Sequence, residues 1–308
     1  MAEIQKLGSF RKSWLLTKAA WNGLRLDKEL LALPIIGIAL SFALLAACAL
    51  GVVAAPHGVF YNGTSIFNTS VYSGSLHITT LGYVAITAVS LALSIISTFI
   101  YGALIHGALE RFNGGDPTIS SSLRAARKRF GSLAAFSTFS FTIGYVLSAI
   151  VERVPFIGAR IVVWLADAAW NVASFFAVPV IVSSDEAVNP IQATKQSISL
   201  IRKTWGESLV ASAAIGLTVL LGMLLYFALS AAIIIVGAQL HTPTLIMFIV
   251  GAVLILGAFG IALIFNVLSA FVKAALYHYA TTGTSPVTFN QELLRQSFTT
   301  KKARKIFA

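Results

Sequence analysis

The sequence predicts an all-α, polytopic membrane protein with about six transmembrane helices, arranged as three hairpins and flanked by cytosolic amphipathic helices. Three observations predict this fold class. Hydrophobic residues make up 57% of the 308 residues and charged residues only 11%, with a mean hydropathy of +0.85. A soluble domain cannot bury that much apolar surface. The apolar residues form six long runs, and the basic residues gather between alternate runs.

Each of the six runs is long enough to be a membrane-spanning helix. About 20 apolar residues at 1.5 Å each cover the roughly 30 Å of hydrocarbon in a bilayer. The predicted spans are residues 31–55, 79–105, 132–151, 160–183, 208–236 and 244–270. Residues 1–30 are predicted to form a cytosolic basic amphipathic helix, residues 31–283 the transmembrane bundle, and residues 284–308 a basic cytosolic tail.

The basic residues set the expected orientation. With the N-terminus inside, 20 of the 22 Lys and Arg residues lie in cytosolic segments, and only Arg153 and Arg160 lie in an outer loop. Short loops rich in Lys and Arg stay on the cytosolic side, so both termini are expected there, in a cell (plasma) membrane protein. The net charge of +11 then points to the bilayer and its anionic inner-leaflet lipids as partners, and not to nucleic acid.

An internal repeat is suggested by three basic segments that precede the odd-numbered spans. In each, a Ser is followed eight residues later by an aromatic residue, with basic residues between them. The pairs are Ser13 and Trp21, Ser122 and Phe130, and Ser197 and Trp205. One interpretation is a three-fold repeat of a basic helix and a membrane hairpin. The other is that any segment next to a membrane carries basic and interfacial aromatic residues.

Helix start signals follow the even-numbered spans. They are Asp116-Pro117, Asn189-Pro190 and Ser285-Pro286. A short polar side chain caps free backbone amides, and Pro fits the first helical turn.

Basic amphipathic helices are expected at residues 4–25 and 190–205, lying along the cytosolic membrane surface and packing under the bundle. In the second helix, Ile191, Ile198, Ile201 and Trp205 are predicted to share the apolar face. The expected interfacial anchors are Trp14, Trp21, Trp205 and Phe130.

Three segments resemble a widespread family of uncharacterised prokaryotic membrane proteins, catalogued as a domain of unknown function. They are FRKSWLLTKAAWNGLRLDKELLALPIIG near the start, FFAVPVIV followed by IQATKQSISLIRKTWGESL in the middle, and KAALYHYATTGTSPVTFNQELLRQSF at the end. More distantly, the layout is similar to the membrane domain beside some glycerophosphodiester phosphodiesterases. That resemblance implies no activity here, because the catalytic domain has no counterpart in this sequence.

Asp167 is the acidic residue placed well inside a predicted span, and Asn171 follows one helical turn later. A carboxylate in hydrocarbon costs at least ~2.5 kcal/mol on insertion scales, so other helices are expected to shield it from lipid. The two residues could line a polar pathway or a small binding site. Alternatively, Asp167 pairs with Arg160 or takes part in a hydrogen bond between helices. Lys273 is expected to extend its amine to the cytosolic interface.

Small residues recur every four positions in two spans. They are Ser90, Ser94, Thr98 and Gly102 in the second span, and Ser140, Gly144 and Ser148 in the third. Such ridges let helix backbones approach closely in lipid, so helix packing is the favoured interpretation, with a lined pore as the alternative.

No catalytic residues, cofactor or metal site are predicted. His57 and His77 flank the first outer loop, which supplies no Cys, Asp or Glu to complete a set of metal ligands. The favoured function is therefore a non-enzymatic scaffold or accessory factor acting on lipids or on other membrane proteins, including further copies of the chain. The alternative is a transporter or channel for a small solute or lipid. A scaffold predicts a closed bundle, whereas a transporter predicts a polar cavity that reaches Asp167.

Overall fold

All regular secondary structure in the described chain is helical, as the sequence predicts. The computed structural model describes residues 18, 20–25, 27–54, 80–153, 157–205, 210–239 and 243–286, and these contain no strand. Residues 20–25 are helical. The elements that follow are η2 (Lys28–Leu31), α2 (Ala32–Ala54), α3 (Thr80–Phe112), α4 (Ile119–Lys128), α5 (Phe130–Arg153), α6 (Ile157–Ala173), α7 (Ala177–Ser183), α8 (Pro190–Trp205), α9 (Val210–Gln239) and α10 (Thr244–Thr282).

Five stretches within the described residues are long and apolar enough to cross a membrane. They are Lys28–Gly51, Gly82–Phe112, Phe130–Arg153, Arg160–Ser183 and Leu245–Thr282. The fifth predicted span coincides with α9, which is 30 residues long. Within it, Gly222–Gly237 is an apolar helical segment that is shorter than the other five. The structure thus supports several membrane-length helices.

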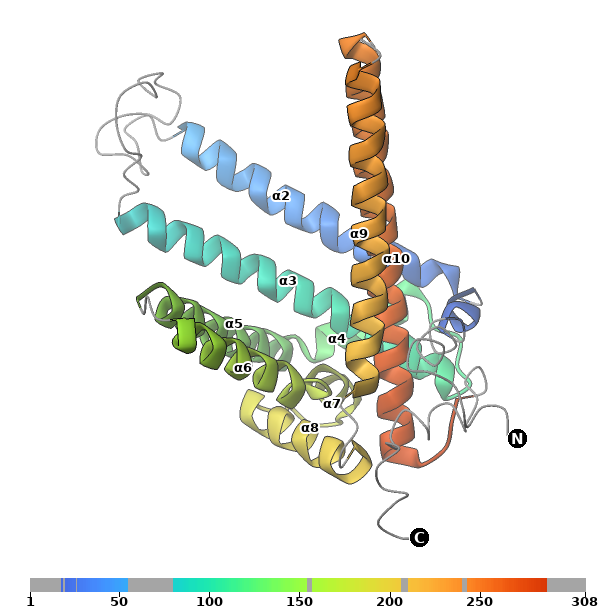
Figure 1. The fold of residues 1–308 in the computed structure, drawn as a ribbon. Helices are drawn as coiled ribbons and strands as arrows, with labels where there is room; N and C mark the ends of the chain where they lie inside the picture. The colour runs from blue at the N-terminus through green and yellow to red at the C-terminus, as the bar shows by residue number, and fades with distance from the viewer. Residues whose placement is uncertain are drawn as a thin grey trace.

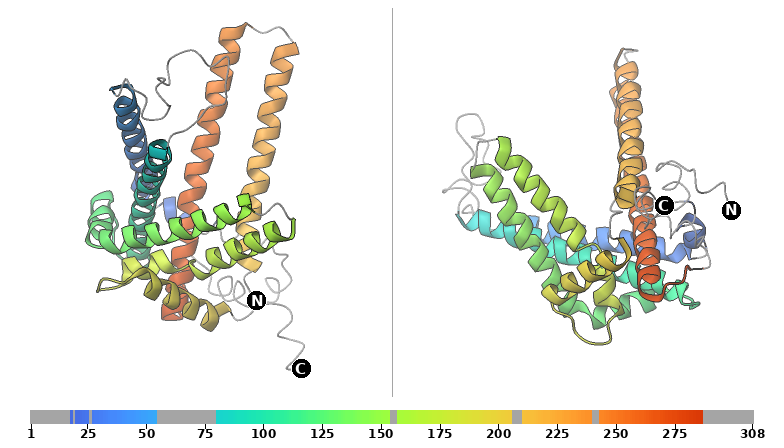
Figure 2. Two further views of the ribbon diagram at one scale, coloured as in Figure 1. Left: turned by 90° about the vertical axis from the view of Figure 1, so that its left-hand side faces the viewer. Right: turned by 60° about the horizontal axis from the view of Figure 1, so that its bottom comes forward.

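The helices form three antiparallel hairpins that meet at one end and diverge at the other. The end where α3, α7 and α10 finish is called the inner end below. Hairpins α2–α3 and α5–α6 lie side by side, whereas α9–α10 leads away from them (Figures 1 and 2). Among the described residues, α9 makes an extensive contact only with α10. In the part of the chain that the structure describes, the helices pack closely at the inner end, and the hairpins diverge beyond it (Figure 1).

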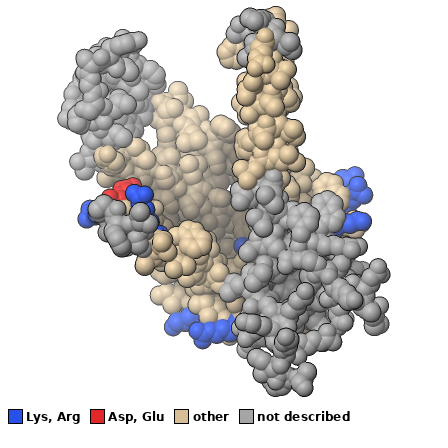
Figure 3. All heavy atoms as spheres, viewed as in Figure 1, with Lys and Arg blue, Asp and Glu red and all other residues tan. Residues whose placement is uncertain are grey.

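The diverging α9–α10 hairpin presents an apolar surface. Phe248 and Ile255 of α10 are 75% and 71% exposed, and Leu225 of α9 is 62% exposed. Apart from Lys273 near the inner end, the described residues of α9 and α10 include no Lys, Arg, Asp or Glu, and the diverging part of the hairpin is tan where it is described (Figure 3). Long apolar surfaces of this kind require a non-aqueous surrounding.

The packed core lies at the inner end. Its largest fully buried side chains include Leu104 of α3, Phe176 just before α7 and Phe271 of α10. The Phe112 ring meets Phe271 edge-on with 6.0 Å between centroids, and the Phe176 ring lies 5.8 Å from that of Tyr277. Burial of each such side chain contributes about 1.5–3 kcal/mol, so these contacts hold α3, α7 and α10 together.

The predicted fourth span is interrupted, because α6 ends at Ala173 and α7 begins at Ala177. Pro179 explains the break. Proline has no N–H and its ring clashes with the carbonyl four residues earlier, so it is tolerated only in a first helical turn. The freed N–H of Phe176 donates to the buried Ser197 hydroxyl of α8 at 2.9 Å. This hydrogen bond fixes the broken helix against α8.

The helix starts agree with the predicted signals to different degrees. Helix α8 begins at Pro190, and Asn189 Oδ1 accepts from the Gln192 N–H at 2.8 Å, which confirms the expected cap. Helix α4 begins two residues after Pro117, because Thr118 and Ser121 form a reciprocal capping box. The third expected start, after Ser285-Pro286, continues outside the described residues.

Two inner helices share the repeat position that the sequence suggests. Ser122 of α4 and Ser197 of α8 are both fully buried, and both helices cover the inner end. The first copy, at Ser13, lies outside the described residues. The alternative interpretation as ordinary sequence next to a membrane therefore stays open for that copy.

The small residues of α3 pack against α5. Ser94 and Ser137 share a hydrogen bond of 2.8 Å between their hydroxyls, and a Cβ added at Gly102 would lie 3.0 Å from Leu133. These contacts support packing as the role of Ser94 and Gly102.

An ion pair ties the start of the chain to the inner end. Asp27, which is 5% exposed, accepts two hydrogen bonds from Arg111 near the end of α3, one of them from Nε at 2.6 Å. The same guanidinium donates to the exposed Asp116 at 2.7 Å. Because Arg111 lies in α3 and Asp27 just before η2, this network fixes the entry of the chain into α2.

Candidate functional site

A cavity of about 420 Å³ opens where the α9–α10 hairpin diverges from α2–α3. Four helices contribute its lining. Its residues are Pro34, Gly37, Ile38 and Ser41 of α2, Ser97, Thr98, Ile100 and Tyr101 of α3, Val178 of α7, and Phe259, Ala262, Leu263 and Asn266 of α10. Volumes of 300–1,000 Å³ with mostly apolar walls and a few polar groups are typical of ligand sites.

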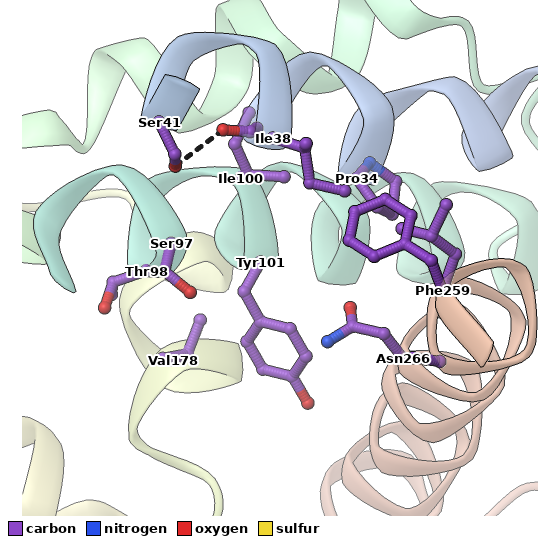
Figure 4. A pocket seen from close by; sticks show the side chains of 13 residues that line it. Pro34, Ile38, Ser41, Ser97, Thr98, Ile100, Tyr101, Val178, Phe259 and Asn266 are labelled. Carbon is purple, nitrogen blue, oxygen red and sulfur yellow. Dashed lines mark hydrogen bonds between the residues drawn. The ribbon is translucent and has the colours of Figure 1, made fainter. Parts of the chain in front are cut away.

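The cavity walls are set by close helix packing at its base. A Cβ added at Gly37 of α2 would lie 3.1 Å from the Ile100 side chain, so glycine allows the two helices to meet there. The Ser41 hydroxyl donates to the Gly37 carbonyl at 2.8 Å and is thereby satisfied within its own helix. Helix α10 leads away from this contact, and its Phe259 and Asn266 line the cavity together with Pro34 of α2 and Tyr101 of α3 (Figure 4).

Two polar side chains face each other across the lower part of the cavity. Tyr101 of α3 and Asn266 of α10 point toward one another in Figure 4. Asn266 is exposed, and no hydrogen bond from its amide to another described residue is found. Both residues lie four positions from the inner ends of their predicted spans, or about 6 Å at 1.5 Å per residue. These two side chains thus lie toward the inner ends of α3 and α10.

A lysine lies just below the cavity on the same face of α10. Lys273 follows Asn266 by seven residues, or two helical turns. Its amine lies 5.1 Å from the ring centroid of Tyr101 and 4.7 Å from that of Phe175, both within cation–π range. The amine is thus held against two aromatic rings, and α10 continues for nine residues beyond it.

The structure places Asp167 and Asn171 together but away from this cavity. The Asn171 amide donates to the Asp167 carboxylate at 3.1 Å and to its carbonyl at 2.9 Å. Both side chains are exposed on α6 and neither lines the cavity. The expectation that other helices of the chain shield Asp167 is therefore wrong, as is the ion pair with Arg160, which is not formed between these two described residues. Seven residues of helix separate them, too far for direct contact.

The residues predicted to be interfacial anchors differ in their surroundings in the structure. Trp21 is half-buried and packs on the inner core, with the Arg25 guanidinium 5.6 Å from its ring centroid. Phe130 is 48% exposed and meets the ring of Phe99 edge-on at 5.8 Å. Trp14 and the side chain of Trp205 lie outside the described residues. Their expected role as anchors stays a prediction.

The buried face of α8 differs from the predicted one. Ala193, Ser197 and Ile201 are buried at four-residue spacing, whereas Ile191 is 55% exposed. The prediction counted only large apolar residues, but the close contact with α7 selects small ones. Ile198 is half-buried beside a shallow groove that includes Lys195.

The described residues contain no group of three or more His, Cys, Asp or Glu placed to hold a metal ion. His57 and His77, the pair considered for a metal in the sequence, lie outside the described residues.

Sequence reasoning missed Asn266 and Tyr101 as site residues. Asn266 is an amide inside the sixth predicted span, and polar residues at such positions usually mark a site. That signal could have found it. Tyr101 carried no comparable signal, because aromatic residues near a membrane interface are common.

These features define an all-helical protein with several membrane-length apolar helices and a cavity between two hairpins that is lined by apolar and a few polar side chains. The chain belongs to a family of unknown function, DUF6159, whose family model matches residues 80–287. This agrees with the resemblance to an uncharacterised family, although the match begins after α2 and so excludes the first of the three resembling segments. None of the curated proteins and none of the solved structures compared with the chain matches it.

Proposed function

We propose that this protein is a non-enzymatic, multi-pass membrane protein that binds lipid in the cavity between α2, α3 and α10. In this role it acts as a scaffold or accessory factor for lipids or for other membrane proteins. The observation that carries the proposal is the cavity itself, because it opens between diverging apolar hairpins and combines apolar walls with a few polar groups. Tyr101 and Asn266 lie toward its inner end, and the hydroxyls of Ser41, Ser97 and Thr98 lie farther out. An amphiphile likewise combines a long apolar part with a few polar groups.

The membrane arrangement is part of this proposal. Helix α9 is 30 residues long and apolar, which supports it as a sixth span beside the five membrane-length stretches. The basic residues favour an orientation with both termini and the inner end facing the cytosol, in the cell membrane. The cavity then lies in the inner leaflet.

The composition of the walls favours lipid over a small polar solute. Ile38, Phe259 and Leu263 form apolar walls, and the outer side of the cavity continues into the exposed apolar surface of α10. A solute pathway needs polar lining along its whole length, whereas an acyl chain needs apolar walls that open sideways to the bilayer. The route considered for a transporter ran through Asp167, which does not line this cavity.

The proposed lipid site can be tested by photolabelling, combined with a variant in which a larger side chain fills the cavity. A diazirine-bearing phosphatidylcholine in nanodiscs should label the α3 peptide that contains Ser97 and Tyr101, relative to labelling of the lipid-exposed face of α9. Ala262→Phe places a ring in the cavity and should reduce this relative labelling several-fold. Ala252→Phe is the matched control, because Ala252 is exposed on the same helix but does not line the cavity. Equal labelling in the two variants would rule out a lipid site here.

A further inference from the structure

Beneath the proposed lipid site, the charge of Lys273 is not neutralised by any described residue. No described carboxylate lies within ion-pair distance of its amine, and its contacts are the rings of Tyr101 and Phe175. Ring faces orient a cation and partly stabilise it, but they do not cancel its charge. A half-buried ammonium group in this position favours an anionic ligand.

The position of this amine relative to the cavity fits a lipid headgroup. Lys273 lies three residues beyond the inner end of the sixth predicted span, and Asn266 lies about 10 Å higher on the same face of α10 at 1.5 Å per residue. A lipid whose acyl chain enters the cavity therefore passes its ester region near Asn266 and Tyr101. Its phosphate then reaches the depth of Lys273.

The donors along this path match that chemistry. The Asn266 amide supplies N–H donors at the level of the ester carbonyls, and the Tyr101 hydroxyl can donate or accept. A lysine ammonium binds phosphate as a compact point charge. The ring of Tyr101 lines the cavity on one side and contacts the Lys273 amine, so a single residue connects the apolar and the charged parts.

We propose that the cavity selects an anionic phospholipid of the inner leaflet, with an acyl chain between α2, α3 and α10 and the headgroup at the Lys273 amine. This inference rests on the proposed function, because it names the lipid class that the same cavity takes. The net charge of a zwitterionic headgroup is zero, so it gains less from an amine with no described carboxylate beside it than an anionic headgroup does. Selection is therefore an electrostatic preference added to the apolar binding of the chain.

The experiment compares two diazirine lipids that differ only in headgroup, phosphatidylglycerol and phosphatidylcholine. Each is added at the same trace level to the full-length protein in phosphatidylcholine nanodiscs, and labelling of the cavity peptide of α3 is measured by mass spectrometry. We expect the anionic probe to label this peptide at least about fivefold more, as the attraction of one lysine for an anionic lipid predicts. Lys273→Gln should remove this preference and Lys273→Arg should retain it.

Lys195→Gln is the matched control, since Lys195 is exposed on α8 and lies outside the cavity. It should leave the preference unchanged. If wild-type protein is labelled equally by both probes, or if Lys273→Gln keeps the preference, the anionic selectivity is refuted while the lipid site stands. If neither probe labels the cavity above the exposed face of α9, the lipid site itself is refuted. Size-exclusion elution and melting temperature of each variant verify that it is folded, and the wild-type comparison decides the question without any variant.

Discussion

Removal of Asp27 should destabilise the protein far more than removal of Asp116, although both carboxylates bind the same guanidinium of Arg111. The two differ in their surroundings. The Asp27 side chain is 3% exposed and takes two hydrogen bonds from Arg111, whereas the Asp116 side chain is 91% exposed and takes one. The comparison therefore contrasts a buried carboxylate that accepts two hydrogen bonds with an exposed one that accepts a single bond from the same guanidinium.

The magnitude follows from this geometry. Loss of one member of a buried pair costs about 3–5 kcal/mol, and a hydrogen bond to a charged group contributes about 1.5–3 kcal/mol. Arg111 keeps Asp116 and its side chain is 24% exposed, so solvent and the second carboxylate recover part of the loss. We expect Asp27→Ala to lower the free energy of unfolding by about 3 kcal/mol, and Asp116→Ala by less than about 1 kcal/mol.

Both losses in the free energy of unfolding can be measured in mixed micelles. The protein is titrated with a denaturing detergent, and unfolding is followed by circular dichroism. The double variant Asp27→Ala, Arg111→Ala completes a cycle that separates the pair from the individual side chains. A coupling energy below about 0.5 kcal/mol, or equal losses for the two aspartates, would refute the conclusion that this ion pair fixes the entry into α2.

Two further predictions concern the inner helices and the orientation. Ser197→Ala should cost about 1–3 kcal/mol because it removes the hydrogen bond that the Ser197 hydroxyl accepts from the buried backbone N–H of Phe176. Ser122→Ala should be close to neutral, since the buried Ser122 hydroxyl has no hydrogen-bond partner among the described residues. Melting temperatures of the two variants decide, and equal losses would contradict the account. In a chain free of native cysteine, an impermeant thiol reagent should label Thr64→Cys from outside and Lys128→Cys only from inside, and the reverse pattern would overturn the proposed orientation.

The positions of the membrane-length helices could be predicted from the sequence, but the inner ends of α3 and α10 could not. Helix α2 spans Ala32–Ala54 against a prediction of 31–55. Helices α3 and α10 continue to Phe112 and Thr282, beyond the predicted ends at residues 105 and 270. Hydropathy detects where a helix meets lipid. Beyond that point, packing against other helices extends the helix, and this depends on residues far away in the sequence.

The cavity was outside the reach of sequence reasoning for a related reason. Gly37, Tyr101 and Asn266 are separated by up to 229 residues and meet only because α10 packs against α3 at the inner end and then diverges. Asp167 drew attention because it is charged within an apolar run. The carboxylate in fact accepts a hydrogen bond from Asn171, one turn away in the same helix, and the local sequence could predict this contact. The exposure of Asp167 depends on the placement of α5 and α8, and the local sequence could not predict that.

The location of the core at the inner end has a consequence for how the protein is made. Leu30 and Leu33 from the beginning of the chain share one core with Phe271 and Leu276 from the last helix. Translation at about 5–20 residues per second delivers the last hairpin tens of seconds after the first. Until then, the inner part of α3 lacks α10, a helix with which it shares an extensive contact. A ribosome that stalls before α10 therefore leaves a membrane-inserted chain with an incomplete core on the cytosolic side proposed above, where chaperones and proteases can recognise it.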